Sequence, residues 1–480
     1  MKLDASLRGK LPPVPEPTPF TDAASGLRGW QVRIPGGRPL ATPAVVDGRV
    51  FLGGGFGSYD FYGLDADSGR VAWQYQTEDD GPTAAVVADG RVVFNTESCE
   101  LEVLTTEGQK VWKHWLGDPL LSMPAIGGGR VFMAYPDSRA DRRHYLACFD
   151  LADGRQVWRQ PMTGEVITCP VLDNGHVYLA NLDGTLACFE QEDGRPLWQE
   201  ARNATSAPAV WREQCYFSQR DEVRERAGAA AAAAAQQMEY LARKRAAAGT
   251  PTERYAGTAS PADYLDHEKR RHRSPHYGTH GAFDGKVGFA GHKGDAKIAQ
   301  AMGNLGTGHV FGVWAFQGSK PSIAYGRLFS GLGDTVHCAD PETKEVFWKS
   351  KLRQGDAEAE LLDSILTPPA LVNGKLFLGT LDGRVLCLSA DSGETLWSVR
   401  VGEAVLLQPA VARGRVYAPT AAGSLFCLET GDPADDGWLM WGATAAHNGL
   451  PDAAPTRRTR GTRPPRASRS VESEVPAEVL

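Results

Sequence analysis

One spacing of residues recurs along the chain and constrains its fold more than any other feature. A glycine lies four residues before a tryptophan in six copies, and most successive copies are 39 to 49 residues apart. The copies pair Gly26 with Trp30, Gly69 with Trp73, Gly108 with Trp112, Gly154 with Trp158, Gly194 with Trp198, and Gly393 with Trp397. A seventh copy ends at Trp348 and has Lys344 in place of the glycine. A fixed period of this length indicates repeated units that pack against their neighbours.

Each unit has the same internal pattern. A start such as TPAV (42–45) or QPAV (408–411) leads through a glycine turn into an apolar strand such as GRVFLGG (48–54). The 54 glycines and 31 prolines among 480 residues supply these turns. Short β-branched and aromatic strands separated by glycine turns predict antiparallel sheet. Four strands per unit of about 43 residues match one blade of a β-propeller.

The unit count predicts an all-β fold, an eight-bladed propeller closed by the N-terminal strand. Eight unit starts lie at Pro43, Thr83, Pro124, Pro170, Pro208, Pro321, Pro369 and Pro409. The last unit has no Gly-x-x-x-Trp strand after Cys427, whereas the strand that ends at Trp30 has no unit before it. We therefore expect this first strand to complete the last blade, which removes open sheet edges from the ring.

The domain organisation follows from this count. We expect an N-terminal extension (1–25), the propeller (26–430), an insertion within the fifth blade (219–307), an aromatic cap segment (431–451) and a disordered tail (452–480). Seven consecutive alanines at 229–235 predict a helix over 220–249, and Pro261 begins a second over about 260–272. The insertion is thus expected to be mainly helical. It is either a surface decoration or a docking element for a protein partner.

The pattern Asp-x-x-x-Gly-x-x-x-Trp at Asp65, Gly69 and Trp73, and again at Asp150, Gly154 and Trp158, resembles the tryptophan-docking repeat of the PQQ-like, or quinoprotein alcohol dehydrogenase-like, β-propellers. That family also includes the propeller lipoprotein of the outer-membrane β-barrel assembly machine. The resemblance implies that each tryptophan is structural and wedges against the next blade. For the quinoprotein enzymes it implies an adjacent pair of cysteines, a Glu/Asn/Asp calcium set and an Asp base, but no two cysteines are adjacent here.

The cysteines follow the repeat. Cys148, Cys188, Cys338 and Cys387 each lie ten residues before the tryptophan of their own unit, and Cys427 occupies the same strand position. Equivalent positions in neighbouring blades lie too far apart for disulfides, so we expect small buried hydrophobic residues. Catalytic or metal-binding thiols are the alternative. Free thiols and the lack of an apolar leader predict a cytoplasmic protein, or a periplasmic one if the N-terminus has been trimmed.

Histidines cluster inside the insertion, at His267, His272, His276, His280 and His292. Their spacing matches no compact metal motif, and their neighbours are basic. We therefore expect a solvated, basic segment and keep a metal site as the weaker alternative.

The C-terminal region contains two further features. The segment GWLMWGATAAHNGLP (437–451) resembles an aromatic element that flanks many PQQ-like propellers, so Trp438 and Trp441 are expected to cap the ring. Six arginines between positions 457 and 469 lie among Pro, Thr and Ser, which predicts a disordered tail able to contact an acidic protein, RNA or anionic lipid.

These observations favour a non-catalytic scaffold or binding protein, without a cofactor, that recognises protein partners through the 219–307 insertion and the propeller loops. The net charge of −7 argues against nucleic acid as the partner of the ring, and no run of about 18 apolar residues predicts a membrane span. Two alternatives stay open: a quinone-dependent oxidoreductase, on the family resemblance, and a sensor that holds a small ligand in the central funnel.

Overall fold

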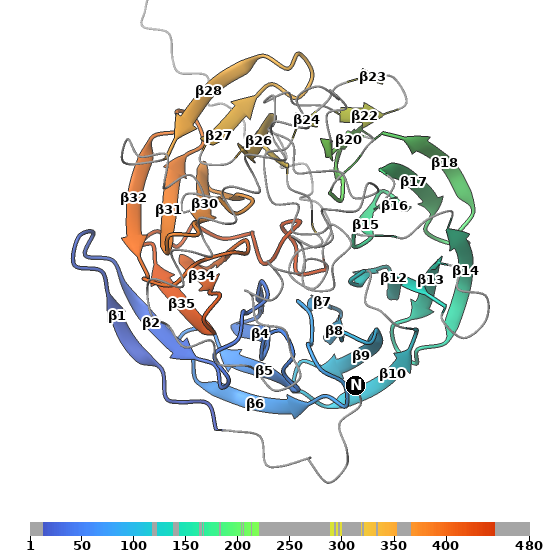
Figure 1. The fold of residues 1–480 in the computed structure, drawn as a ribbon, viewed down its shortest axis with the longest axis horizontal. Helices are drawn as coiled ribbons and strands as arrows, with labels where there is room; N and C mark the ends of the chain where they lie inside the picture. The colour runs from blue at the N-terminus through green and yellow to red at the C-terminus, as the bar shows by residue number, and fades with distance from the viewer. Residues whose placement is uncertain are drawn as a thin grey trace, which may run out of the picture.

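The computed structural model describes most of residues 13–446 as a ring of β-sheets (Figure 1). The larger gaps in this description are 118–121, 138–143, 220–288, 300–317 and 353–365, and the smaller ones fall at 163–165, 167, 182–183, 203, 205, 213, 292–293, 296–297, 319–320 and 333–334. The sheets that form the blades are antiparallel, and in all but the one that contains both ends of the described chain the strands follow the chain from the axis of the ring outward.

Six blades are built from four consecutive strands. The first is β3 (Ala44–Val46), β4 (Arg49–Gly53), β5 (Asp60–Asp65) and β6 (Val71–Gln76). The second is β7 (Val86–Ala88), β8 (Arg91–Asn95), β9 (Glu100–Thr105) and β10 (Lys110–Trp115). The third is β11 (Ala125–Gly127), β12 (Arg130–Pro136), β13 (His144–Asp150) and β14 (Gln156–Met162). The fourth is β15 (Val171–Asp173), β16 (His176–Ala180), β17 (Thr185–Glu190) and β18 (Pro196–Ala201).

The other two of these six blades follow the insertion. One is β25 (Ser322–Ala324), β26 (Arg327–Leu332), β27 (Thr335–Ala339) and β28 (Val346–Lys351). The other is β29 (Ala370–Val372), β30 (Lys375–Gly379), β31 (Arg384–Ser389) and β32 (Thr395–Arg400). Each innermost strand of these six blades has three residues and an apolar middle residue, which is buried in all but β25, where Ile323 is half-buried.

A seventh blade closes the ring with both ends of the chain. It contains β33 (Ala410–Ala412), β34 (Arg415–Pro419) and β35 (Ser424–Glu429), followed outward by β2 (Arg28–Arg33) and β1 (Thr18–Thr21). Cys427 lies directly opposite Trp30 across the β35–β2 ladder, so closure by the N-terminal strand is confirmed. The fifth strand, β1, was not predicted; Phe20 on it packs edge-on against Phe426, with ring centroids 5.3 Å apart. This five-stranded sheet is called the closing blade below.

The prediction of eight blades is wrong, because seven blades are complete. At the position expected for the fifth, β19 (Ala209–Trp211) and β20 (Gln214–Tyr216) pair with β22 (Phe289–Gly291) and β23 (Gly294–Asp295). These outer strands contain three and two residues, where the other blades have five to seven. Among the described residues this sheet contains no full-length outermost strand with a Gly-x-x-x-Trp pattern. The innermost strand β19 still lies between β15 and β25.

The described residues form strands and no helix, and most of the insertion lies outside them. The described parts of the insertion are the strands β22, β23 and β24 (Ile298–Ala299), and β24 pairs in parallel with β21 (Ser218–Gln219). The two helices predicted over 220–249 and 260–272 lie outside the described residues. Within the described part of the chain, no helix long and apolar enough to cross a bilayer occurs.

Candidate interaction surface

The repeat tryptophans join neighbouring blades through five equivalent contacts. Each indole lies on the glycine of the next blade: Trp30 on Gly69, Trp73 on Gly108, Trp112 on Gly154, Trp158 on Gly194, and Trp348 on Gly393. Each of these glycines has a positive φ between 71° and 81°, and a Cβ there would lie 2.4 to 2.7 Å from the indole. Glycine is therefore required by both the backbone conformation and the space.

Four of these five indoles are also held by a hydrogen bond to the next blade. Trp73 Nε1 donates to the carbonyl of Thr106 at 2.9 Å, and Trp348 Nε1 donates to that of Ala390 at 3.1 Å. Trp112 and Trp158 make the equivalent bonds to Leu151 and Gln191, whereas Trp30 Nε1 is buried without a hydrogen-bond partner among the described residues. Packing at all five junctions, with a hydrogen bond at four of them, gives these tryptophans a structural part in the ring.

Two repeat tryptophans and one repeat position depart from this pattern. Trp198 packs against the apolar cluster that contains Cys215, in the incomplete sheet. Trp397 packs among the apolar residues between the β29–β32 blade and the closing blade. Lys344 takes the place of a docking glycine and keeps its positive φ of 68°. A side chain is tolerated there because the incomplete sheet before it supplies no docking indole within the described residues.

All eight cysteines are buried and none forms a disulfide, which confirms the expectation of small apolar residues. The five repeated ones lie directly opposite the tryptophan of their own blade, as Cys148 does opposite Trp158. Burial raises the pKa of Cys148 and Cys387 to about 12, so neither thiol is a thiolate at neutral pH. The cysteines therefore serve the packing of the blades rather than thiol chemistry.

A second contact between blades was missed from the sequence. The first residue of the second strand in several blades carries a cation that reaches the outer turn of the next blade. Arg130 donates to the carbonyl of Glu192 at 2.7 Å, Arg327 donates to that of Ala390 at 3.2 Å, and Arg415 pairs with Asp67 at 2.8 Å. The recurring Gly-Arg-Val or Gly-Lys-Leu turn was the available signal, and it was interpreted only as turn and strand.

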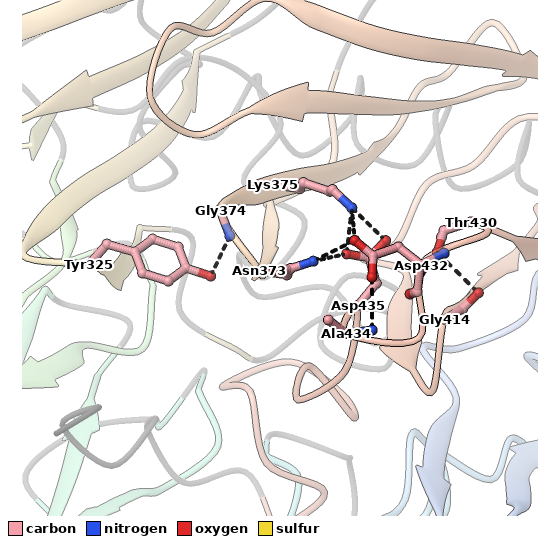
Figure 2. A network of polar contacts seen from close by, with 9 residues as sticks. All are labelled: Tyr325, Asn373, Gly374, Lys375, Gly414, Thr430, Asp432, Ala434 and Asp435. Carbon is pink, nitrogen blue, oxygen red and sulfur yellow. Dashed lines mark hydrogen bonds and ion pairs between the residues drawn. The ribbon is translucent and has the colours of Figure 1, made fainter. Parts of the chain in front are cut away.

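At the closing blade this cation lies at the centre of a polar network (Figure 2). Lys375 Nζ lies 2.8 Å from Asp435 Oδ1 and 2.9 Å from Asp432 Oδ2, and Asn373 Nδ2 donates to the same two oxygens. Burial opposes the charge of Lys375, but the hydrogen bonds that Lys375 Nζ donates to Asp435 and Asp432 raise its pKa. The hydrogen bond from Lys375 lowers the pKa of Asp432. This network holds the loop after β35 where other blades present the docking glycine.

The segment after this loop returns to the axis and lies along four innermost strands (Figure 1). The backbone N–H groups of Val411, Val45, Val87 and Ile126 donate in turn to the carbonyls of Trp438, Leu439, Ala445 and Ala446, at 2.5 to 3.3 Å. Trp438, Met440 and Trp441 are buried against the inner strands. We call residues 437–446 the axial segment. Residues 447–451 of the expected cap lie outside the described residues.

A buried acidic network joins the β3–β6 and β7–β10 blades. Tyr75 donates to Glu102 Oε2 at 2.6 Å, and Lys113 Nζ lies 2.9 Å from Glu100 Oε1 and 2.8 Å from Glu78 Oε2. Burial raises the pKa of the Glu102 carboxyl to about 7. Burial, with the charge of Asp80, also raises the pKa of Glu97 to about 8, so both carboxyls hold a proton over part of the neutral range.

The exposed large apolar side chains of the described residues gather in one sector of the ring. They are Tyr325, Val346 and Phe347 of the β25–β28 blade, and Leu396 of the β29–β32 blade, each 41 to 53% exposed. Phe347 and Leu396 are equivalent, since each precedes a repeat tryptophan on the outermost strand of its blade. We call these four residues the outer apolar surface. None was singled out from the sequence, where such residues are indistinguishable from the buried ones of other strands.

The remaining sites named from the sequence do not support a cofactor or metal centre. The adjacent cysteines that a quinoprotein enzyme implies are absent from the sequence, and the cysteines present are dispersed among the blades. In the described ranges no three His, Cys, Asp or Glu side chains are grouped so that they could hold a metal ion. His267, His272, His276, His280 and His292 lie outside the described residues.

Comparison with known proteins shows which family and which solved structures this chain is similar to. A family model described as outer membrane protein assembly factor BamB matches residues 20–114, 100–221 and 333–459. The structure of BamB from Moraxella catarrhalis is similar with a TM-score of 0.52 and 16% identity, covering 87% of this chain and 98% of that one. The structure of quinohemoprotein alcohol dehydrogenase from Comamonas testosteroni is similar with a TM-score of 0.52 and 12% identity, covering 85% and 77%. At these identities the likeness shows the fold alone.

Two curated relatives match shorter stretches. Quinoprotein alcohol dehydrogenase PedH of Pseudomonas putida is 30% identical over 101 residues, which is 19% of this chain and 17% of the relative. Quinohemoprotein alcohol dehydrogenase ADH-IIG of Pseudomonas putida is 27% identical over 133 residues, covering 24% and 18%. The matched stretch therefore spans less than a fifth of the length of either relative.

Proposed function

The chain belongs to the β-propeller family described as outer membrane protein assembly factor BamB, and from this premise we propose that it is a non-catalytic scaffold that binds protein partners within a larger assembly. The observation that carries the proposal is the outer apolar surface. Phe347 and Leu396 lie on the outermost strands of two adjacent blades, and both point into solvent.

With the residues that the structure describes, Phe347 and Leu396 make no contact like that of Tyr325, whose hydroxyl accepts a hydrogen bond from Gly374 N–H of the next blade at 3.0 Å (Figure 2). The tryptophans that follow these two residues face the neighbouring blade, whereas Phe347 and Leu396 alternate to the opposite side of the strand. At the equivalent position the β3–β6 blade has the small residue Ala72, and the other four-stranded blades have half-buried Val or Leu. Exposed apolar side chains grouped on one sector mark a contact site for another protein.

The start of the insertion supports a contact in the same sector. The chain enters it at β21, directly after β20 of the sheet whose innermost strand β19 lies beside β25. We therefore propose that residues 219–307 extend the contact with the partner. Deleting 222–286, which spares β22, β23 and β24, is expected to leave the ring folded and to reduce recovery of the partner.

A quinone-dependent oxidoreductase is not proposed for this chain. The family resemblance was its only support, and the cysteine pair that the resemblance implies for such an enzyme is missing from the sequence. A fold of this kind serves many unrelated functions, so the function must be argued from the site.

The proposal is tested by substituting the outer apolar surface. The double variant Phe347→Ser and Leu396→Ser is compared with Ala72→Ser, which changes the equivalent exposed position of another blade. We expect the double variant to keep its melting temperature and to lose at least about ten-fold in recovery of co-purifying protein from the native cell, because interface anchors contribute most of the binding energy. Equal recovery with the double variant and Ala72→Ser would show that this surface binds no partner.

A further inference from the structure

The innermost strands of the ring present equivalent backbone groups to the axis. In each three-residue strand the first and last residues bond to the second strand, and the middle residue directs its N–H and C=O inward. Carbonyls of the axial segment accept hydrogen bonds from the middle N–H groups of β33, β3, β7 and β11. These are four consecutive innermost strands of the ring. One half of the inner edge is therefore covered by this chain itself.

The other half has the same geometry without such a cover. Its middle residues are Leu172 in β15, Val210 in β19, Ile323 in β25 and Leu371 in β29. Each is paired with its second strand in the same register as Ile126, so its N–H also points to the axis. Among the described residues, no protein acceptor bonds to any of these four N–H groups.

The axial segment shows which chemistry this edge accepts. It offers the backbone carbonyls of Trp438 and Leu439 and, six residues later, those of Ala445 and Ala446, and a turn between them brings Leu439 N–H to the carbonyl of Ala443. Edge N–H groups bind another chain through its main chain, which supplies affinity with little demand on side chains. The matching ligand is therefore a polypeptide segment that presents backbone carbonyls to the axis as the axial segment does.

We propose that the inward N–H groups of β15, β19, β25 and β29 donate hydrogen bonds to the backbone carbonyls of a segment of a partner protein. The axial site, as we call these four edges, is distinct from the outer apolar surface. The proposal rests on the proposed scaffold function, because it supplies a second contact for a protein partner.

The experiment uses the full chain and, as probe, a synthetic peptide with the sequence GWLMWGATAA of residues 437–446. Hydrogen–deuterium exchange is followed by mass spectrometry in fragments that contain each innermost strand. We expect the peptide to slow exchange about five-fold at Leu172, Val210, Ile323 and Leu371, and to leave the covered strands β33, β3, β7 and β11 unchanged. No slowing at the axial site, or equal slowing everywhere, overturns the proposal.

Two variants of Leu371 distinguish the contribution of its N–H group to peptide binding from that of its side chain. Leu371→Pro removes the inward N–H but no ladder bond, and proline is tolerated at such an edge. Leu371→Ala truncates the side chain comparably and keeps the N–H. We expect Leu371→Pro to weaken peptide binding about three- to ten-fold relative to Leu371→Ala, the loss of one hydrogen bond. Equal binding by the two variants contradicts the proposed bond.

A third form of the protein, ending at residue 446, identifies a competing occupant. If the peptide slows exchange only in this shortened form, residues 447–480 of the chain occupy the axial site and a partner segment does not. The peptide assay needs no native partner. If the peptide fails to slow exchange while the double variant Phe347→Ser and Leu396→Ser still reduces recovery of the partner, the axial site is rejected and the scaffold function stays supported.

Discussion

Single glycines decide how closely adjacent blades pack. Gly108 has a φ of +81° and lies under Trp73, whereas Gly90 has a φ of +70° and nothing within 4 Å of where its Cβ would lie. Both positions would strain an alanine, but only Gly108 would also force the indole away. The comparison of these two positions therefore isolates the docking contact from the cost of the left-handed backbone.

We expect Gly108→Ala to lower the free energy of unfolding by about 3 kcal/mol, from backbone strain of about 1 kcal/mol and overpacking against Trp73. Gly90→Ala should lower the free energy of unfolding only by the backbone strain of about 1 kcal/mol. Urea unfolding followed by tryptophan fluorescence measures both. Equal losses in the two variants would mean that the glycine is required by the turn alone.

The buried carboxyl of Glu102 makes stability depend on pH. Its folded pKa of about 7 lies above the ordinary value of 4.5, so the fold holds a proton that the unfolded chain releases. This contribution to stability is fully present below pH 4.5 and is lost as the pH rises through 7. The change in the free energy of unfolding caused by Glu102→Gln should therefore be more favourable at pH 8 than at pH 5, by on the order of 2 to 3 kcal/mol.

Melting temperatures at the two pH values test this expectation. The control is Glu192, whose side chain is exposed. Glu192→Gln should have the melting temperature of the native protein at both pH values. If the melting temperature of Glu102→Gln changes between pH 5 and pH 8 by as much as that of the native protein, another group controls stability in this pH range.

At the scale of elements, the loop after β35 depends on Lys375. Asp435 is fully buried, and without the cation two carboxylates would face each other beside Asn373. We expect Lys375→Met to cost about 3 kcal/mol, since removing one partner strands a buried charge. Arg70→Met, which breaks an ion pair with Glu16 that is 71 and 79% exposed, should cost less than about 1 kcal/mol.

Adding Asp432→Asn and Asp435→Asn to Lys375→Met should restore most of this loss, because the buried charges are then removed. Thermal unfolding of the three proteins decides the point. If Lys375→Met is no worse than Arg70→Met, the network does not secure the closing blade.

The repeat made much of this element structure predictable. Gly-x-x-x-Trp spacing located the outermost strands, and the position of Cys427 relative to Trp30 indicated closure by the N-terminal strand. The blade count failed because a unit start such as Pro208 predicts only the first two strands of a blade. Whether the outer two form depends on the sequence that follows, and here the chain enters the insertion after Gln219.

The polar contacts and the outer apolar surface were less accessible to sequence reasoning. Lys375 meets Asp435 only because two blades are adjacent in the ring, and their separation along the chain gives no signal. Phe347 and Leu396 have the same residue types as buried strand positions, and their exposure follows from which side of the outermost strand they occupy.

For the whole molecule, the ring divides its surfaces between two tasks. Tryptophans, cysteines and second-strand cations hold the blades together, and the axial segment covers half of the inner edge. The outer apolar surface is left for binding. This division is what a scaffold requires, because a partner can bind without disturbing the contacts that close the ring.

The scaffold function is tested most directly by a photoreactive phenylalanine analogue, p-benzoylphenylalanine, placed singly at position 347, 396 or 72 in the native cell. Irradiation and mass spectrometry then identify what each position touches. We predict that positions 347 and 396 cross-link to the same partner protein and that position 72, its counterpart on the β3–β6 blade, does not. Cross-links of equal yield and identity from all three positions, or none from 347 and 396, would contradict the account.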